Sequence, residues 1–385
     1  MVSREVECPL CSTVYDYHTP KQHAASLIRR DSDFCPYYSG PNPLYYVIYV
    51  CPNCHFSAYK DDFKNFEERS AAPLRDMLKK DSLGLAVNYN QVERSLFGAL
   101  RAYQLALNCY TTRNSRPEVT AGVALRAGWM CRYAGELRRE LGFLEMARDL
   151  YKQAFESGMR TDRNVDDLAV AFLIGELMLR TGNIADSMRY FMLLIQADDA
   201  RDALDRSAKD RLYDSKQAVR VKDLLDKIPL LEPMGDQGRG LLAVNTEVKT
   251  YKQGATICSK GEAGESMFVI ASGKVRVYLD DPARCDPVAV LGPGDTIGEM
   301  SLFTGEPRSA AILAGSDTDD NKKGPPGVVE LVEIRKTAVR NLLKIVPEVV
   351  QGVAERIAER KAQNASVPVG VVADGEEAAA DGRAR

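Results

Sequence analysis

A series of short apolar segments separated by glycines, between residues 250 and 314, restricts the fold of this chain more than any other feature. The segments at residues 267–270, 275–278 and 288–291 are rich in Val and Ile, as β-strands are. Glycines at positions 254, 261 and 273 stand before and between such segments, where an antiparallel sheet needs tight corners. This rhythm predicts a β-barrel of the jelly-roll type.

Two further segments follow these strands and carry the candidate binding chemistry. Residues 294–303 read Gly-Asp-Thr-Ile-Gly-Glu-Met-Ser-Leu-Phe, and residues 307–312 read Pro-Arg-Ser-Ala-Ala-Ile. Joined in this order, they resemble the phosphate-binding cassette of the cyclic-nucleotide-binding domains of catabolite-activator proteins, protein-kinase regulatory subunits and gated channels. The separation of Glu299 and Arg308 matches the pattern of that family. The resemblance implies such a domain at residues 241–362.

The residue types of the cassette suit a cyclic nucleotide. Gly298 allows a sharp turn into a short helix, whose first N–H groups can face a phosphate. Arg308 brings a guanidinium group to the same phosphate, and the Glu299 carboxylate can accept a hydrogen bond from the ribose 2′-hydroxyl. The expected nucleotide-binding residues are Gly298, Glu299, Met300, Ser301, Arg308 and Ser309.

The identity of the nucleotide stays open between cAMP and cGMP. The Ser309 hydroxyl can reach the phosphate or a guanine edge, so it is compatible with both. The bacterial character of the chain favours cAMP. The alternative for the whole domain is a degenerate barrel that keeps the fold and has lost its ligand.

The end of the chain is predicted to be helical and then disordered. The polar, Gly- and Pro-rich insertion at residues 315–327 should loop out between two strands. The resemblance implies that the helices after it close over the base as a lid, or pair with a second subunit in a homodimer; ordinary packing against the barrel is the alternative. Their apolar residues are Leu342, Leu343, Val346, Val349, Val350, Val353 and Ile357. Residues 363–385 should form a disordered tail.

Two Cys-Pro-x-Cys motifs stand near the start of the chain. Such tight turns aim two thiolates at one point, and two turns supply the four sulfur ligands of a tetrahedral Zn²⁺ ion. We therefore expect one structural zinc in a zinc-ribbon-like domain at residues 1–70, with a strand at residues 45–50 leading into the second motif. A redox pair or no metal is the alternative. The expected ligands are Cys8, Cys11, Cys51 and Cys54.

The remaining Cys and His residues in this part are expected to play packing or surface roles. A zinc bound by four Cys is closed, with no position open for catalysis. The residues set aside as ligands are Cys35, His18, His23 and His55. Four cysteines further along should be small buried hydrophobes: Cys109, Cys131, Cys258 and Cys285.

Residues 71–228 have helical periodicity and contain an apparent repeat of forty residues. The spacing is that of a tetratricopeptide (TPR) repeat, in which small residues let antiparallel helices approach and an aromatic ring fills the gap. A generic helical bundle is the alternative. A Pro- and Gly-rich linker is expected at residues 229–240. The matched residues are Gly135, Gly142, Ala147, Tyr151 and Ala154 in one copy, and Gly175, Gly182, Ser187, Phe191 and Leu194 in the next.

The first 215 residues resemble an uncharacterised bacterial family with a zinc-ribbon start and a TPR-like body. The resemblance rests on the two cysteine motifs and on the segments at residues 30–34, 42–46 and 173–177. It differs at His55, where the pattern has a Gly after the second motif. The family supplies no biochemical activity.

Length and composition are compatible with this multidomain α+β organisation. The 385 residues suffice for two or three domains, and a net charge of −3 argues against broad binding to nucleic acid. No signal peptide or membrane-spanning segment is expected, so the protein should be cytoplasmic. The sequence shows no nucleophile–base pair and no open metal site, so we do not expect an enzyme.

The sequence therefore predicts a cytoplasmic cyclic-nucleotide sensor whose barrel regulates a zinc-ribbon/TPR-like module that binds an unidentified protein. The alternatives are a transcriptional regulator that uses the zinc ribbon on nucleic acid, and a structural interaction protein with a ligand-free barrel. Residues 12–50 lack clustered Lys and Arg, which weighs against the regulator that binds nucleic acid.

Overall fold

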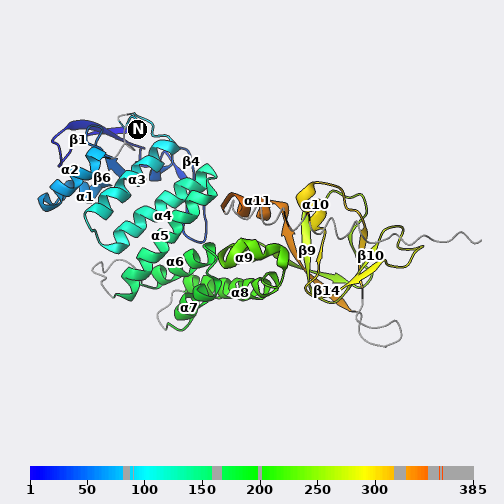
Figure 1. The fold of residues 1–385 in the computed structure, drawn as a ribbon. Coiled ribbons are helices and arrows are strands. Elements are labelled where there is room, and N and C mark those ends of the chain that lie inside the picture. Colours follow the sequence, from blue (N-terminus) through cyan, green and yellow to red (C-terminus); the bar gives the residue numbers. More distant parts are fainter. Residues whose placement is uncertain are drawn as a thin grey trace, which may run out of the picture.

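The computed structural model describes residues 1–80, 87–89, 91–157, 167–197, 202–315 and 327–345, together with residues 355 and 358. Figure 1 shows three successive parts: small β-hairpins at the amino-terminal end, a body of helices, and a β-barrel beyond them. Among the described residues, no helix is long and apolar enough to cross a lipid bilayer.

The amino-terminal part consists of three separate two-stranded antiparallel hairpins. They pair β1 (Val2–Glu7) with β2 (Val14–Thr19), β3 (Ser26–Arg30) with β4 (Pro36–Ser39), and β5 (Ile48–Val50) with β6 (Ser57–Tyr59). The strand expected over residues 45–50 is shorter than predicted, because Pro43–Tyr46 forms the 3-10 helix η1, with Asn42 as its N-cap. A short helix, α1 (Lys60–Lys64), and the 3-10 helix η2 (Glu68–Ser70) complete this part.

Among the described residues, eight α-helices follow and pack mainly against their neighbours in sequence. Their bounds are α2 (Ala71–Lys80), α3 (Leu96–Thr112), α4 (Pro117–Ala134), α5 (Leu137–Glu156), α6 (Asp167–Arg180), α7 (Ile184–Ile195), α8 (Asp202–Leu225) and α9 (Gly235–Val244). The 3-10 helix η4 (Pro229–Met234) joins α8 to α9. The expected linker at residues 229–240 is therefore helical. Leu231, Met234 and Gly240 are buried there, and this burial outweighs the low helix propensity of the segment.

The forty-residue register predicted for the repeat is wrong. Gly135 is the left-handed cap that ends α4, whereas its supposed equivalent Gly175 lies buried inside α6. The structural equivalent of Gly135 is Gly182, the left-handed residue after α6, 47 residues later. The two helix pairs α4–α5 and α6–α7 therefore correspond with a longer period than the sequence suggested.

Small residues do allow close helix packing at equivalent positions of this longer period. A Cβ atom on Gly175 would lie 2.7 Å from the ring of Phe191, which fills the gap between α6 and α7. A Cβ atom on Gly128 would lie 3.0 Å from Leu144, between α4 and α5. Gly175 thus lies at a close helix contact that an aromatic ring fills, as predicted for the repeat. Gly142 does not lie at such a contact, since nothing lies within 4 Å of its Cβ position.

The barrel consists of two facing four-stranded antiparallel sheets, with strand orders β11-β10-β13-β8 and β12-β9-β14-β7. Their apolar faces enclose a common core that includes Phe268, Val275, Ile312 and Leu331. The strands are β7 (Glu247–Lys252), β8 (Thr256–Cys258), β9 (Ser266–Ser272), β10 (Val275–Tyr278), β11 (Ala289–Leu291), β12 (Thr296–Ile297), β13 (Ala311–Ala314) and β14 (Val328–Arg335). The glycine-separated apolar segments thus form the predicted strands.

The described part of the barrel includes the helices α10 (Glu299–Thr304), between β12 and β13, and α11 (Lys336–Ile345), after β14. In Figure 1, α11 extends from the barrel towards the helical body, near α9. Most of the predicted insertion, the apolar stripe Val349, Val350, Val353 and Ile357, and the tail at residues 363–385 lie outside the described residues.

The hydrophobic cores cross the expected boundaries. One core joins the amino-terminal hairpins to α3 and α4, through side chains such as Tyr17, Phe56, Leu105 and Met130. Residues 1–70, predicted as a separate zinc-ribbon-like domain, thus share the core of the helices. A second core runs from α8 through α9 into the barrel, and its members include Val221, Leu225, Leu241, Leu242, Val269, Leu302 and Val332.

Candidate ligand sites

The cassette begins with a sharp turn at Gly298, between β12 and α10. Gly298 has a φ of +78°, a backbone conformation that residues with a Cβ rarely adopt. A Cβ atom there would also lie 2.0 Å from Nη1 of Arg308. Both the backbone conformation and the close approach of Arg308 therefore require glycine at this position.

Arg308 is the most enclosed charged group of the cassette, with only 6% of its surface exposed. Its Nη1 donates to the Gly298 carbonyl at 2.8 Å, and its Nη2 donates to the Ser266 carbonyl. Its buried Nε has no hydrogen-bond partner among the described residues. The backbone thus fixes the guanidinium group and leaves one buried donor for an acceptor from outside the described chain.

The loop before β9 frames the cassette. The N–H of Arg308 donates to the Glu262 carbonyl at 2.9 Å, and the N–H of Gly261 donates to the Arg308 carbonyl at 2.8 Å. A Cβ atom on Gly264 would lie 2.1 Å from the Cβ of Ser301. Ser266 and Gly264 were missed by the sequence reasoning; the Gly-Glu-Ser sequence just before a strand was the available signal.

The other predicted cassette residues are placed differently with respect to solvent. Glu299 and Ser301 are buried, Met300 and Gly298 are half-buried, and Ser309 is exposed. The turn therefore brings Gly298 and Arg308 into direct contact, with Glu299, Met300 and Ser301 following at the start of α10. Ser309 lies beside Arg308 in sequence but faces the surface.

The four predicted zinc ligands come together at the other end of the molecule. Sγ of Cys8 lies 3.6 Å from Sγ of Cys54, and Sγ of Cys11 lies 3.6 Å from Sγ of Cys51. All four sulfur atoms lie within 4.8 Å of one another. Tetrahedral Zn²⁺ with Zn–S bonds of about 2.3 Å places its sulfur ligands about 3.8 Å apart, so the donor set and its spacing fit this ion.

The two cysteine turns have the same backbone geometry. The residue after each motif, Ser12 or His55, has a φ near +60° and donates its N–H to the carbonyl of the first Cys. The N–H of Cys8 donates to the Thr13 carbonyl, and that of Cys51 donates to the Phe56 carbonyl. The position where the family pattern has Gly is therefore left-handed here too, and His55 adopts this conformation.

The proximity of the thiols makes their ionisation unequal. Hydrogen bonds from Cys54 and Cys8 lower the pKa of Cys51, and the hydrogen bond with Cys51 raises the pKa of Cys8 and that of Cys54. The thiolate form of one Cys thus opposes ionisation of its neighbours. Four thiolates at this spacing require a cation among them.

The other Cys residues mostly occupy the predicted packing positions. Cys35 is buried, and its Sγ lies 3.5 Å from the Tyr133 hydroxyl. Cys109, Cys131 and Cys258 are also buried, as predicted. Cys285 is exposed, so the prediction was wrong for this residue; it lies in the loop between β10 and β11, which the barrel core does not cover.

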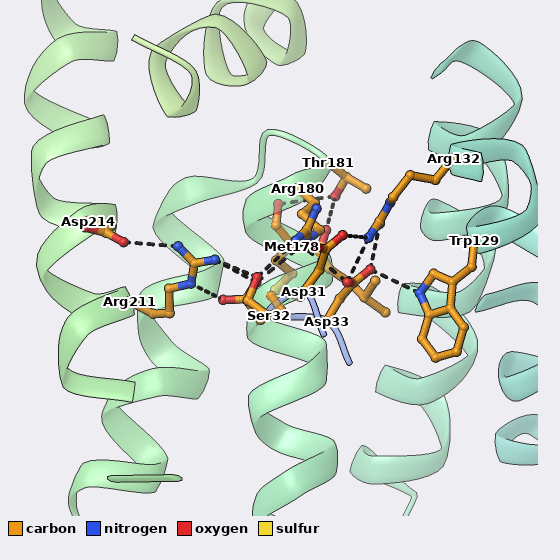
Figure 2. A network of polar contacts seen from close by, with 12 residues as sticks. Asp31, Ser32, Asp33, Trp129, Arg132, Met178, Arg180, Thr181, Arg211 and Asp214 are labelled. Atoms are coloured by element: carbon orange, nitrogen blue, oxygen red, sulfur yellow. Dashed lines mark hydrogen bonds and ion pairs between the residues drawn. The ribbon is translucent and has the colours of Figure 1, made fainter. Parts of the chain in front are cut away.

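A third polar cluster ties the segment at residues 30–34 to the helices, as Figure 2 shows. Arg132 on α4 contacts Asp33 at 2.6 Å and Asp31 at 2.9 Å, while the indole Nε1 of Trp129 donates to Asp33 at 3.2 Å. Burial opposes ionisation of Asp33, but the hydrogen bonds from Arg132 hold its pKa below the usual range. Asp33 is fully buried, so these contacts compensate its charge.

The same cluster extends to α6 and α8. Arg180 donates to the Ser32 hydroxyl at 2.9 Å, and Arg211 donates to it as well, at 2.6 Å. Arg211 also pairs with the buried Glu176. The sequence reasoning noted residues 30–34 only as part of a resemblance, and their charged partners lie about 100 to 180 positions away in the chain. No local pattern could reveal this cluster.

Curated relatives match well under half of the chain. A cyclic nucleotide-gated potassium channel of Mesorhizobium japonicum is 30% identical over 148 residues, which are 38% of this chain and 37% of the channel. A cAMP-dependent protein kinase regulatory subunit of Colletotrichum orbiculare is 31% identical over 144 residues, 37% of this chain and 34% of that protein. The cyclic AMP receptor protein of Thermus thermophilus is 35% identical over 94 residues, 24% of this chain and 43% of that protein. The chain thus covers well under half the length of these relatives.

Solved structures superpose on part of the chain. The regulatory domain of Toxoplasma gondii PKA with cAMP is 20% identical, with a TM-score of 0.34, covering 43% of this chain and 56% of that one. The Thermus thermophilus catabolite activator protein is 28% identical, with a TM-score of 0.30, covering 36% of this chain and 60% of that one.

Two family models match the chain in succession. Residues 248–319 match the cyclic nucleotide-binding domain, in agreement with the glycine-cornered strands and the cassette. Residues 1–219, more than half of the chain, match a family described as uncharacterized protein conserved in bacteria (DUF2225). The chain therefore belongs to the bacterial DUF2225 family and carries a cyclic nucleotide-binding domain after the family's own region.

Proposed function

We propose that this protein is a cytoplasmic cyclic-nucleotide sensor, with cAMP favoured over cGMP, whose barrel regulates a protein-binding module formed by the rest of the chain. The observation that carries the proposal is the buried Nε of Arg308, the donor that the backbone leaves unpaired beside the Gly298 turn. An unpaired buried donor is costly, and the anionic phosphate of a cyclic nucleotide would supply its acceptor.

The proposed roles follow from the residue types and their positions. Arg308 would bind the cyclic phosphate, together with the N–H groups around Met300 and Ser301, while the buried Glu299 carboxylate would accept from the ribose 2′-hydroxyl. Ser309, which is exposed, would reach the phosphate or the edge of the base. Gly298 would keep the turn tight enough for Arg308 to lie against it.

We further propose that Cys8, Cys11, Cys51 and Cys54 hold one structural zinc ion. The sulfur spacing and the all-thiol donor set support this site. When bound, the ion would neutralise thiolate charge and join the two hairpin turns; with four protein ligands it would leave no position for a substrate. Reduced thiols fit a cytoplasmic location.

The remaining parts of the proposal concern organisation and partners. We propose a zinc-ribbon-like part at residues 1–70, a TPR-like helical part at 71–228, a connection at 229–240 and the nucleotide-binding domain at 241–362. The helical part would bind a protein partner, as stacked helix pairs often do, and the carboxy-terminal helix would offer a contact for a homodimer. The net charge of −3 supports neither binding to nucleic acid nor association with an anionic membrane surface.

The test is calorimetry of the full-length protein with cAMP and with cGMP. We expect one nucleotide per chain, and Arg308→Ala should weaken binding about tenfold to a hundredfold, since a charge-assisted hydrogen bond contributes about 1.5–3 kcal/mol. Arg284→Ala is the matched control, because Arg284 is an exposed arginine of the same barrel. Failure of the unmodified protein to bind either nucleotide, or equal binding by Arg308→Ala, would leave the barrel with a structural role.

A further inference from the structure

The barrel is attached to the helical body by a contact between two backbones. A Cβ atom on Gly240 of α9 would lie 2.4 Å from the carbonyl oxygen of Gly182, in the turn between α6 and α7. A Cβ atom on Gly182 would in turn lie 2.8 Å from the Gln237 carbonyl oxygen. No side chain separates α9 from the turn here, so a shift of either element displaces the other.

Polar contacts hold the same turn from two sides. Gln237 of α9 donates to the Thr181 carbonyl at 3.2 Å and also bonds to Glu145 of α5. Arg148 of α5 donates to the Thr181 hydroxyl at 2.9 Å, and Thr181 is fully buried. The α6–α7 turn, Thr181 to Asn183, is thus held jointly by α5 and α9.

α9 also contributes to the core that continues from the helices into the barrel. Leu241 and Leu242 of α9 lie in the same cluster of buried side chains as Leu302 of α10, the helix of the cassette. Met267 and Val269 of β9 belong to the same cluster. A rearrangement of α10 on nucleotide binding would therefore repack side chains that also position α9.

The route through α11 is less tightly packed. A cavity of about 550 Å³ lies between α5, α9 and the start of α11, and Leu141, Leu241, Thr337 and Asn341 are among the residues that line it. The start of α11 borders this space, whereas α9 has no gap at Gly182. The packing favours α9 over the carboxy-terminal helix as the coupling element.

We propose that the contact of α9 with the α6–α7 turn couples the nucleotide state of the barrel to the helical region. This proposal rests on nucleotide binding by the cassette. The turn follows α6 directly, and α6 carries Glu176 and Arg180, which pair with Arg211 and with the 30–34 segment. Displacement of the turn would reach that charged cluster, because Arg180 is the last residue of α6 and immediately precedes Thr181.

The experiment is hydrogen exchange of the full chain with and without saturating cAMP, with calorimetry on the same samples. In the unmodified protein we expect exchange at residues 177–187 to change at least about fivefold, the lower end of usual couplings between distant sites. In Gly240→Ala the clash with Gly182 should reduce this change to less than about twofold, while the cassette at residues 296–309 still responds.

Gly142→Ala is the matched control, because it makes the same substitution within a helix at a position with open space. If circular dichroism shows that Gly240→Ala is unfolded, Gln237→Ala replaces it, since this exposed side chain can be removed without a clash. Nucleotide binding without any response at residues 177–187, or an unchanged response in the variant, would overturn the coupling alone. Absence of nucleotide binding would overturn the proposed function and the coupling with it.

Discussion

The cysteine cluster and the nucleotide cassette differ in how much of each site the protein completes by itself. Four thiols face one another within 4.8 Å, and no basic side chain contacts them among the hydrogen bonds and ion pairs of the described residues. In the cassette, two of the guanidinium nitrogens of Arg308 are already bonded to backbone carbonyls. With zinc bound as proposed, the cluster would depend on the ion for stability, whereas the cassette already has its Arg308 fixed by the backbone.

The largest expected effect is loss of the metal. Cys51→Ser, or a strong chelator, should remove a binding free energy of about 10–16 kcal/mol, which equals or exceeds the stability of a typical domain. Because the hairpins share a core with α3 and α4, unfolding of the first 70 residues should be accompanied by a loss of the helical circular dichroism signal.

The control for that substitution is Cys285→Ser, which changes an exposed Cys far from the cluster. Metal analysis of the purified protein should give one zinc per chain. A metal-free protein with ordered hairpins would contradict the dependence on zinc. Unfolding confined to residues 1–70 would contradict the shared core.

An intermediate effect is expected in the charged cluster, where the protein supplies both partners. Asp33→Ala leaves the enclosed Arg132 without its nearest carboxylate and should cost about 3–5 kcal/mol. Thermal denaturation should show a melting temperature lower by about 10 °C. Asp214→Ala, which removes a half-exposed partner of Arg211 in the same cluster, should cost less than about 1 kcal/mol. Equal effects of the two variants would show that burial of the ion pair is not decisive.

A smaller effect is expected when nucleotide is added or withheld. The barrel should remain folded without ligand, because its strands pair with one another and two of the three guanidinium nitrogens of Arg308 are bonded to backbone carbonyls. Nucleotide at a hundred times its Kd should add about 2.7 kcal/mol and raise the melting temperature by about 5–10 °C. Differential scanning calorimetry measures both. A barrel that unfolds without nucleotide would show that the cassette, like the cysteine cluster, needs its ligand to be stable.

The smallest effect is expected at Ser309. Its hydroxyl is exposed, so Ser309→Ala should change binding by one ordinary hydrogen bond, about 0.5–1.5 kcal/mol. Competition calorimetry should show a greater loss for cGMP than for cAMP if the hydroxyl contacts the guanine edge. Equal losses for the two nucleotides would assign the hydroxyl to the phosphate instead.

The sequence predicted those features whose determinants are close together in the chain. The two cysteine turns depend on four-residue motifs, and the barrel strands depend on short apolar segments with glycines at their corners. The turn at Gly298 and its contact with Arg308 are likewise set within eleven residues. Each of these is a local pattern with a direct geometric consequence.

The features that were missed depend on partners distant in sequence. Residues 229–240 have the composition of a linker but are helical, because Gly240 fits against Gly182 only in the folded chain. The repeat was aligned by residue type at forty residues, whereas the caps at Gly135 and Gly182 set a period of 47. The cluster around Asp33 joins segments about 100 to 180 positions apart.

The position of Trp129 has a practical consequence for work on this protein. It is the only tryptophan of the chain, it is almost fully buried, and its indole N–H donates to Asp33. Intrinsic tryptophan emission therefore reports on a single place, the charged cluster of Figure 2. Its wavelength and intensity should follow hydration of that cluster without any added dye, in rapid mixing as well as at equilibrium.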